Sequence, residues 1–305
     1  MDVSIAVPCW LFLMTALFGI FGNSNIIWAS FRSRQLRSAC SIFIAVNALA
    51  DIAHQCGHFV LAYFLVMEDG QATNFVCYLA QAIPLYGCTM GSLMLLFIST
   101  DRLLRMATTT AYNRICNKYY IAIVITVTCV TPLIIAWEGY TVMMTMPDNM
   151  IICAVPHGYV GRASTDFLRF NSFLNITTLV IYAVVYAVAK RRKFKDPRKI
   201  LRSITTVTIC VVCGWMLTMT VGVAFMIVLG NENVPVMVPL YVGLFVNISM
   251  GMSYVIFFAM NRNYRNAFIE QLQILSCGEC KGLAKIRPEV AYTCSHDYCR
   301  KKVNK

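Results

Sequence analysis

Asp51, in the stretch NALAD, is the only acidic residue near the middle of any long apolar run of this 305-residue sequence. A charge near the centre of a bilayer is costly, so a carboxylate there must be neutral, hydrated or paired, and it usually belongs to a functional site. His54, Gln55 and His58 follow at helical spacing on nearly the same face. This polar stripe could line a ligand cavity, or its side chains could simply bond to neighbouring backbone and water. The residue types could also suggest a metal, but the sequence offers no further ligands.

A second pair of charged groups, Asp101 and Arg102, ends a stretch that carries no charge from residue 70 to residue 100. With a rise of 1.5 Å per residue, a helix from Cys77 to Arg102 spans roughly 38 Å, slightly more than a hydrocarbon core of about 30 Å. We therefore predict one membrane-crossing helix with the cysteine at one surface and the two charges at the other. By themselves, these charges could mark only the membrane boundary.

The composition is that of a membrane protein that crosses the bilayer several times. Hydrophobic residues make up 58% of the chain and charged residues only 13%, whereas soluble domains usually carry about 25% charged residues. A spanning helix needs about 20 apolar residues, and the sequence has seven suitable runs. The predicted helices of a domain from 1 to 260 cover about 5–30, 39–67, 74–105, 119–141, 166–189, 203–229 and 236–260. An amphipathic surface helix is predicted at 261–276 and a cytoplasmic tail at 277–305.

The positions of the basic residues predict the orientation, because cytoplasmic segments retain lysine and arginine. If the N-terminus is outside, 24 of the 26 lysines and arginines lie on the cytoplasmic side, and only Arg162 and Arg169 lie outside. The net charge of +12 is then a feature of the inner leaflet, where it can bind anionic membrane lipids. No nucleic acid is expected as a partner.

Several short motifs occur in the order, and on the helices, in which rhodopsin-like seven-helix receptors carry them. The motifs are Gly22-Asn23 in the first helix, Leu-Ala-Asp ending at Asp51 in the second, Cys77 followed 24 residues later by Asp101-Arg102 in the third, Gly214-Trp215 in the sixth, and the amphipathic helix after the seventh. The chain resembles this family from residue 1 to about residue 280. Its compact loops, its triplet Asp-Arg-Leu and its altered helix 7 motif look like the nematode serpentine chemoreceptors, class SX.

This resemblance implies an all-α fold, a seven-transmembrane helix bundle with a short amphipathic membrane-surface helix after helix 7. It implies a G protein-coupled receptor and not an enzyme, with a small-molecule ligand, a heterotrimeric G protein and membrane lipids as partners, and with no cofactor. Asp101 and Arg102 are expected to couple to the G protein, and Asn23 and Asp51 to form an intramembrane pocket for sodium and water. The expected location is the plasma membrane, with the C-terminus cytoplasmic, and for a chemoreceptor the sensory cilia.

The third helix predicts the kind of ligand, because it has no acid between Asp69 and Asp101. It therefore lacks the carboxylate with which the amine receptors of this family bind an ammonium group. We expect a small neutral ligand, held by apolar contacts and one or two hydrogen bonds. The site is expected in the outer half of the bundle, on helices 2, 3, 6 and 7, at His58, Pro84, Cys88, Trp215 and Asn247.

The inner ends of helices 6 and 7 depart most from the family. Its Asn-Pro-x-x-Tyr motif is replaced by the residues from Ser253 to Phe257, so a switch through a tyrosine hydroxyl cannot operate at Phe257. Helix 6 lacks the family's proline and begins with the basic residues Arg198, Lys199 and Arg202. Because no acid of helix 6 faces Arg102, we expect Asp101 to be its main restraint and some signalling to occur without ligand.

Two pairs of cysteines have predicted roles. Cys77 and Cys153 are the clear candidates in the predicted outer segments, so we expect the bridge between helix 3 and an outer loop that the rhodopsin-like family carries. Cys277 and Cys280 directly follow the amphipathic helix, a position typical of palmitoylation. A zinc site that combines them with the tail cysteines and histidine is the alternative, although the spacings match no standard zinc knuckle. No metal is therefore expected.

Other functional classes fit the sequence less well. A neuropeptide-type receptor of the same fold is the nearest alternative. A seven-helix transporter or channel would show internal repeats, broken helices and several intramembrane charges, and none is evident. An intramembrane enzyme would need a nucleophile with its base, or a metal triad, at one depth. The scattered cysteines and histidines supply no such set.

Overall fold

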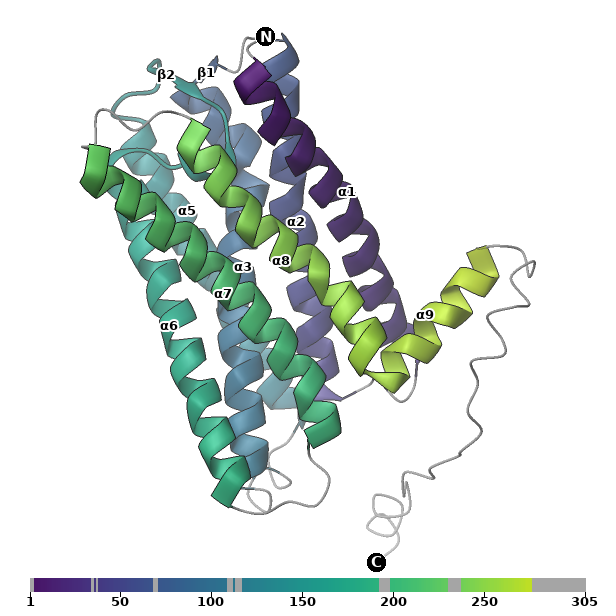
Figure 1. Cartoon of the computed structure of the whole chain (residues 1–305). Coiled ribbons are helices and arrows are strands. Elements are labelled where there is room, and N and C mark those ends of the chain that lie inside the picture. Colours follow the sequence, from purple (N-terminus) through teal and green to yellow (C-terminus); the bar gives the residue numbers. More distant parts are fainter. Residues whose placement is uncertain are drawn as a thin grey trace, which may run out of the picture. The chain divides into compact units, whose positions relative to one another are not determined.

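The computed structural model of the chain describes residues 3–33, 36, 38–67, 71–108, 112, 117–191, 198–229 and 237–275. Within these residues, seven helices are long and apolar enough to cross a membrane (Figure 1). In chain order they are α1 (Val3–Arg32), α2 (Ala39–Met67), α3 (Asn74–Ala107), α5 (Asn117–Met143), α6 (Gly161–Arg191), α7 (Arg198–Leu229) and α8 (Met237–Met260). The predicted seven-transmembrane fold is confirmed, and the chain is a multi-pass membrane protein.

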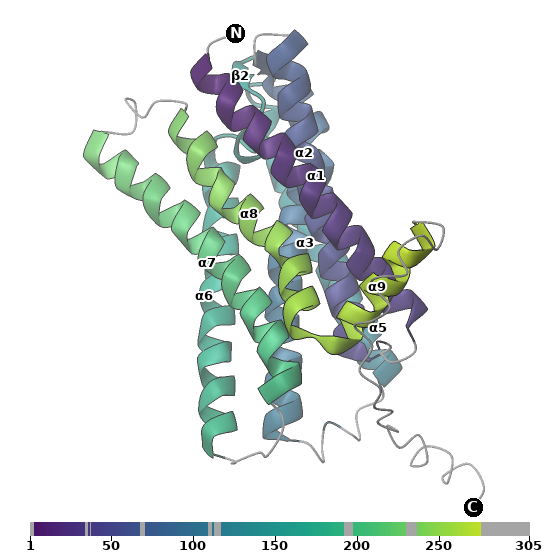
Figure 2. The ribbon, with the colours of Figure 1, turned by 45° about the vertical axis from the view of Figure 1, so that its right-hand side comes forward.

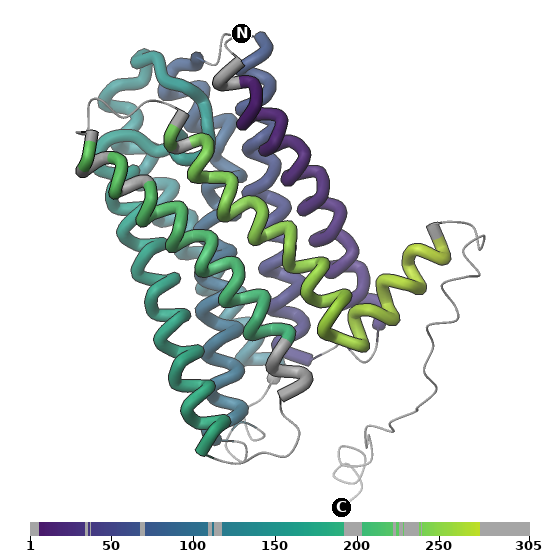
Figure 3. The backbone as a smooth tube through the Cα atoms, in the orientation of Figure 1, coloured from purple at the N-terminus to yellow at the C-terminus, as the bar shows by residue number. Residues whose placement is uncertain are grey.

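A small hairpin of two strands marks one end of the bundle. The strands β1 (Gln71–Thr73) and β2 (Met150–Ile152) pair antiparallel. Thr73 also caps α3, because its side chain accepts a hydrogen bond from the Val76 backbone N–H at 3.3 Å. The N-terminal end of α1 lies at this same end (Figure 3), which we call the hairpin end. The sequence analysis named neither strand, because three residues are too few to show a strand period.

Helix α3 is central to the bundle. It contacts α2, α5 and α6, and the remaining helices close around it, with α1 on α2 and α8, and α7 on α6 and α8. In Figure 2, α3 lies between α1 and α2 on one side and α6 and α7 on the other. Of its most apolar stretch, 72% is buried against protein, compared with 17% for α5. Polar side chains on α3 are therefore shielded from lipid, as a functional site requires.

Helices α2 and α3 approach each other closely at Gly87. A Cβ atom at this position would lie 2.6 Å from the Ala50 carbonyl oxygen and 2.8 Å from the His54 backbone nitrogen. Backbone atoms cannot move aside as a flexible side chain can, so only glycine permits this approach. The polar stripe of α2 that contains Asp51 and His54 is thus held directly against the central helix.

The starts of two helices differ most from the predicted boundaries. Helix α7 begins at Arg198 and not at residue 203, and α6 begins at Gly161 and not at residue 166. Its first turns carry exposed ion pairs, from Arg162 to Asp166 at 3.3 Å and from Arg169 to Asp166 at 3.5 Å. Because charged residues end an apolar run, a prediction from hydropathy assigns these first turns of α6 to a loop. A helix can nevertheless continue beyond the bilayer, where such pairs are solvated on its surface.

The chain forms two compact units, Met1–Phe268 and Ile269–Lys305. The first contains the bundle and the beginning of α9 (Arg262–Leu275), the short helix predicted after helix 7. In this part Tyr264 is fully buried, and its hydroxyl lies 3.1 Å from the Ser30 hydroxyl on α1. Of the second unit the structure describes residues 269–275. The cysteines of the predicted palmitoylation site, Cys277 and Cys280, lie outside the described residues.

Candidate functional site

Five side chains from four helices meet in the half of the bundle toward the hairpin end, and we call them the histidine cluster. They are Phe12 on α1, His54 and His58 on α2, Trp215 on α7 and Asn247 on α8, and all are buried. His58 Nε2 lies 2.6 Å from Asn247 Oδ1, while Asn247 Nδ2 donates to a backbone carbonyl one turn back at 2.9 Å. The amide oxygen therefore faces the histidine, and His58 Nε2 is the donor.

Ring contacts hold the rest of the histidine cluster together. The ring of His58 stacks on Phe12 with centroids 4.5 Å apart and meets His54 edge to face at 5.7 Å. The Trp215 ring lies 6.1 Å from His54. Among the residues that the structure describes, neither ring nitrogen of His54 has a hydrogen-bond partner. One histidine of the cluster is thus paired, and the other is not.

The two α3 residues predicted for the ligand site, Pro84 and Cys88, lie one helical turn apart. Cys88 is buried in the same group of apolar side chains as Trp215. Pro84 packs toward α2, where a Cβ atom added at Gly57 would lie 2.9 Å from the Pro84 Cβ. The structure joins His58 directly to Asn247 and places Cys88 in the same apolar cluster as Trp215. The binding role of these residues stays a prediction.

The segment that follows β2 closes the hairpin end over α2 and α3. Cys153 forms a disulfide with Cys77 near the start of α3, with the two Cα atoms 5.4 Å apart, which confirms the predicted bridge. The short 3-10 helix η2 (Val155–His157) then contacts α2 and α3, and Val155 is buried. Burial lowers the pKa of His157, and its 3.1 Å hydrogen bond to the Ile152 carbonyl partly opposes this shift.

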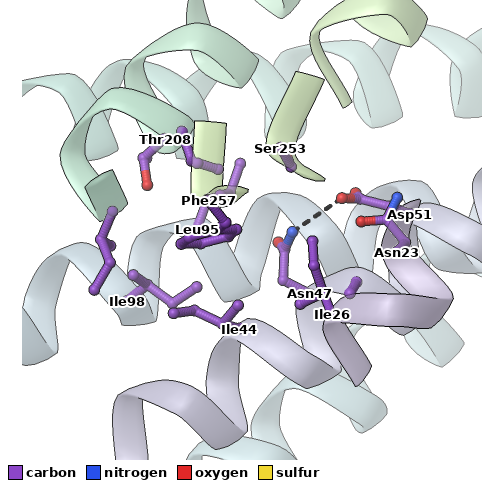
Figure 4. A pocket seen from close by; sticks show the side chains of 13 residues that line it. Asn23, Ile26, Ile44, Asn47, Asp51, Leu95, Ile98, Thr208, Ser253 and Phe257 are labelled. Atoms are coloured by element: carbon purple, nitrogen blue, oxygen red, sulfur yellow. Dashed lines mark hydrogen bonds between the residues drawn. The ribbon is translucent and has the colours of Figure 1, made fainter. Parts of the chain in front are cut away.

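A small cavity lies between α1, α2, α3, α7 and α8, on the other side of the histidine cluster from the hairpin (Figure 4). Asn23 and Asp51, which we predicted to share a pocket, both line it. Asn47 Nδ2 donates to Asp51 Oδ2 at 3.1 Å, the dashed line in Figure 4. The cavity offers about 20 Å³ to the centres of water molecules, which is enough for roughly one water.

The polar atoms around this cavity suit a bound water. Asn23 Nδ2, Asn47 Oδ1 and Ser253 Oγ are buried and have no partner among the described residues, and a buried water typically makes two to four hydrogen bonds. Anywhere in the described residues, no three histidine, cysteine or acidic side chains are arranged to hold a metal ion. Phe257 lines the cavity where the rhodopsin-like family has a tyrosine, so it supplies no hydroxyl there.

At the opposite end of α3, one carboxylate has two partners. Arg102 Nη2 lies 2.8 Å from Asp101 Oδ2, and the Tyr112 hydroxyl donates to Asp101 Oδ1 at 2.7 Å. Asp101 is fully buried and Arg102 is only 4% exposed. Burial and the bond to Asp101 raise the pKa of Tyr112 to about 12. Asp101 and Arg102 are thus ion-paired, and the role of this pair in restraining Arg102 stays a prediction. We call this end of the bundle the arginine end.

Sequence reasoning missed three of these polar residues. Tyr112 follows α3 in the sequence, and nothing local shows that it turns back to Asp101. Asn47 lies one helical turn before Asp51, so the helical period alone could have identified it. Ser253 was recognised only as a replacement in the altered helix 7 motif. At the start of α7 the structure describes the backbone but not the basic side chains of Arg198, Lys199 and Arg202.

Nearer the arginine end, one further contact joins α6 and α7. The Tyr182 hydroxyl on α6 lies 3.1 Å from the Thr208 hydroxyl on α7, and both are buried. Thr208 also lines the cavity at Asp51. Thr208 therefore links the cavity at Asp51 to Tyr182 on α6.

Comparison with known proteins agrees with this arrangement. The chain is 24% identical to melatonin receptor type 1B of Mus musculus over 283 residues, covering 84% of this chain and 75% of that receptor. It is 23% identical to melatonin receptor type 1B of Rattus norvegicus, covering 88% of this chain and 78% of the receptor. The profile of the family described as serpentine type 7TM GPCR chemoreceptor Srsx matches residues 16–272. The chain therefore belongs to the Srsx family of serpentine seven-transmembrane G protein-coupled chemoreceptors, and it is a receptor and not an enzyme.

Proposed function

We propose that this receptor detects a small uncharged ligand in the histidine cluster and signals through a heterotrimeric G protein that binds at Arg102. The observation that carries the proposal is the state of Arg102. Its guanidinium is 4% exposed at the end of the central helix and is ion-paired with Asp101. A buried arginine held by a single acid can be released when the helices move apart, which would expose a cationic site to a partner protein.

The ligand would act by binding the signalling arrangement of helices more tightly than the resting one. The cavity at Asp51 offers a route, since its lining comes from α1, α2, α3, α7 and α8. The residues around the Asp51 cavity would exchange partners as these helices shift. Asn23, Asp51 and the water or sodium ion they could hold would then respond to the ligand without touching it.

Two features support a small ligand over a peptide. The loop bridged by Cys153 places η2 against α2 and α3, so the hairpin end of the bundle is partly covered. The histidine cluster also lies below this cover, and its members are no more than 6% exposed. A peptide would have to displace the whole loop, which the disulfide opposes.

The distribution of charge supports the orientation. The segments predicted to be cytoplasmic hold 24 of the 26 lysines and arginines, and cytoplasmic segments retain such residues. We infer that the hairpin end faces outward, that the arginine end faces the cytoplasm and its anionic lipids, and that the receptor acts in the plasma membrane of sensory cilia.

Signalling by two α3 variants tests this proposal. We expect Arg102→Ala to abolish signalling, while Asp101→Asn raises ligand-free signalling about tenfold, since hydrogen bonds to charged groups contribute about 1.5–3 kcal/mol. Calcium and cAMP would be recorded in cells at matched surface expression. Arg105→Ala is the control, because Arg105 lies one turn along the same helix and is exposed. Unchanged signalling in Arg102→Ala would disprove coupling at this residue.

A further inference from the structure

We propose that His54 recognises the ligand by hydrogen bonding, and that the ligand combines a flat ring with one uncharged polar group, such as an amide or a hydroxyl. This inference rests on the proposed ligand site and adds to it a residue and a chemical class. The observation that points to it is the unpaired imidazole of His54, which is 4% exposed and has no partner for either ring nitrogen among the described residues.

Two other polar members of the histidine cluster, His58 and Asn247, already form hydrogen bonds. His58 donates to Asn247 at 2.6 Å, and the Asn247 amide nitrogen donates to a backbone carbonyl. His58 and Asn247 each already have a hydrogen-bond partner, whereas His54 has none among the described residues. His54 gains a bond and loses none, and a buried polar group without a partner is costly in a bilayer. His54 is therefore the histidine of the cluster that can still form hydrogen bonds with a ligand.

The aromatic neighbours of His54 indicate the shape of the ligand. His54 lies between His58 at 5.7 Å and Trp215 at 6.1 Å, measured between ring centroids. Rings pack favourably against the face or edge of such side chains. A flat ring with a polar substituent could contact Trp215 while its substituent bonds the imidazole. A neutral imidazole offers one donor and one acceptor, which an amide or a hydroxyl can match.

The charges near the cluster argue against an ionic ligand. No member of the histidine cluster is an acid, a lysine or an arginine. The nearest acid along α2 is Asp51, which already accepts a hydrogen bond from Asn47. Asp51 lines the water-sized cavity, and His54 does not. An ammonium or carboxylate group at His54 would thus be buried without a counter-ion, at a large cost in free energy.

The adjacent residue Gln55 provides a matched control. It is also fully buried on α2, and neither of its amide atoms has a partner within the described residues. It packs against α1 instead, since a Cβ atom added at Gly19 would lie 2.6 Å from the Gln55 Cδ. If any unpaired polar group in the bundle could bind the ligand, changing Gln55 would have the same effect as changing His54.

Five simple probes with one ring test the inference: benzamide, benzyl alcohol, toluene, benzylamine and benzoate. The full-length receptor would be labelled with ¹⁵N-histidine in lipid nanodiscs, and probe binding would be followed by the imidazole nitrogen shifts. We expect benzamide and benzyl alcohol to move the His54 signal, which is assigned by its loss in His54→Phe. We expect that variant to bind both probes about tenfold more weakly or worse, because a site built for a hydrogen bond discriminates strongly when the bond is lost.

The controls make each result decisive. Gln55→Leu should change the affinity of the two neutral polar probes less than about threefold, because Gln55 packs against Gly19 on α1 and not against the histidine cluster. His54→Asn should restore part of the binding lost in His54→Phe. Equal affinity in wild type and His54→Phe would overturn the proposal. So would stronger binding of benzylamine, benzoate or toluene than of benzamide, or no response to any probe up to its solubility. These measurements need no G protein, so their result does not depend on whether Arg102→Ala abolishes signalling.

Discussion

Tyr112 donates a hydrogen bond of 2.7 Å to Asp101, on the carboxylate oxygen that Arg102 does not use. One buried carboxylate thereby links the last turns of α3 to a residue beyond the end of that helix. The raised pKa of Tyr112, about 12, follows from burial and from this bond. The tyrosine therefore remains a protonated donor throughout the physiological pH range.

Removing this hydroxyl should loosen the restraint on Arg102. We expect Tyr112→Phe to raise ligand-free signalling about two- to tenfold, since one hydrogen bond contributes about 0.5–1.5 kcal/mol. The rise should be smaller than in Asp101→Asn, which removes the charge itself. Tyr119→Phe is the control, because Tyr119 on α5 is 73% exposed. Basal cAMP and calcium at matched surface expression would decide, and a rise in both tyrosine variants would rule out a specific role for Tyr112.

The disulfide between Cys77 and Cys153 should be essential for a folded receptor. Loss of a native disulfide typically costs about 2–5 kcal/mol, so we expect Cys77→Ser to lose most surface expression. Cys153→Ser should match it, and the double variant should be no worse than either single one. Cys56→Ser serves as the control, since Cys56 is a free and exposed cysteine on α2. Flow cytometry of surface receptor measures the effect, and normal expression of Cys77→Ser would contradict the prediction.

Two glycines one turn apart on α3 should respond differently to an added methyl group. At Gly87 a Cβ atom would lie 2.6 Å from the Ala50 carbonyl oxygen, whereas at Gly91 the nearest atom would be Asp51 Oδ1 at 3.6 Å, an ordinary contact. We expect Gly87→Ala to destabilise the receptor by about 1–3 kcal/mol through overpacking, and Gly91→Ala to be nearly neutral. Thermal unfolding of the purified receptor measures both. Equal stability of the two variants would show that α2 and α3 can separate without cost.

Acid should weaken the loop at the hairpin end. The pKa of His157 is lowered in the folded state, mainly by burial, so its stabilising contribution is present above the unfolded pKa of about 6.5 and is lost as pH falls through the folded value. We expect the unfolding temperature to fall between about pH 7.5 and pH 5, and to fall less in His157→Gln, which cannot gain a proton. The same decrease in both proteins would exclude His157 as the cause.

Much of the candidate site could be predicted from single positions along the chain. Asp51 is conspicuous because it is the one acid in the middle of an apolar run, and Asp101 with Arg102 because the two charges end another. Cys77 and Cys153 could be paired because few other cysteines lie in the predicted outer segments. Each of these inferences depends on residue type and depth in the bilayer, which neighbouring residues in the sequence determine.

The partners of these residues could not be predicted in this way. His58 meets Asn247 across 189 positions of sequence, and no local pattern specifies that pairing. Tyr112 reaches Asp101 from beyond the helix end, and the helical start at Gly161 includes charged residues that hydropathy assigns to a loop. His54 and Gln55 look alike as buried polar neighbours, yet one lies against Trp215 and the other against Gly19.

The sequence by itself determined the seven spans, their expected orientation and the depth of each polar group, because the free energy of placing a residue in lipid or water depends mainly on that residue and its immediate neighbours. The tertiary structure alone decided which face of each helix meets which neighbour. That choice depends on how side chains from distant segments pack, as at Gly87 against Ala50. It is this packing that leaves His58 paired and His54 unpaired.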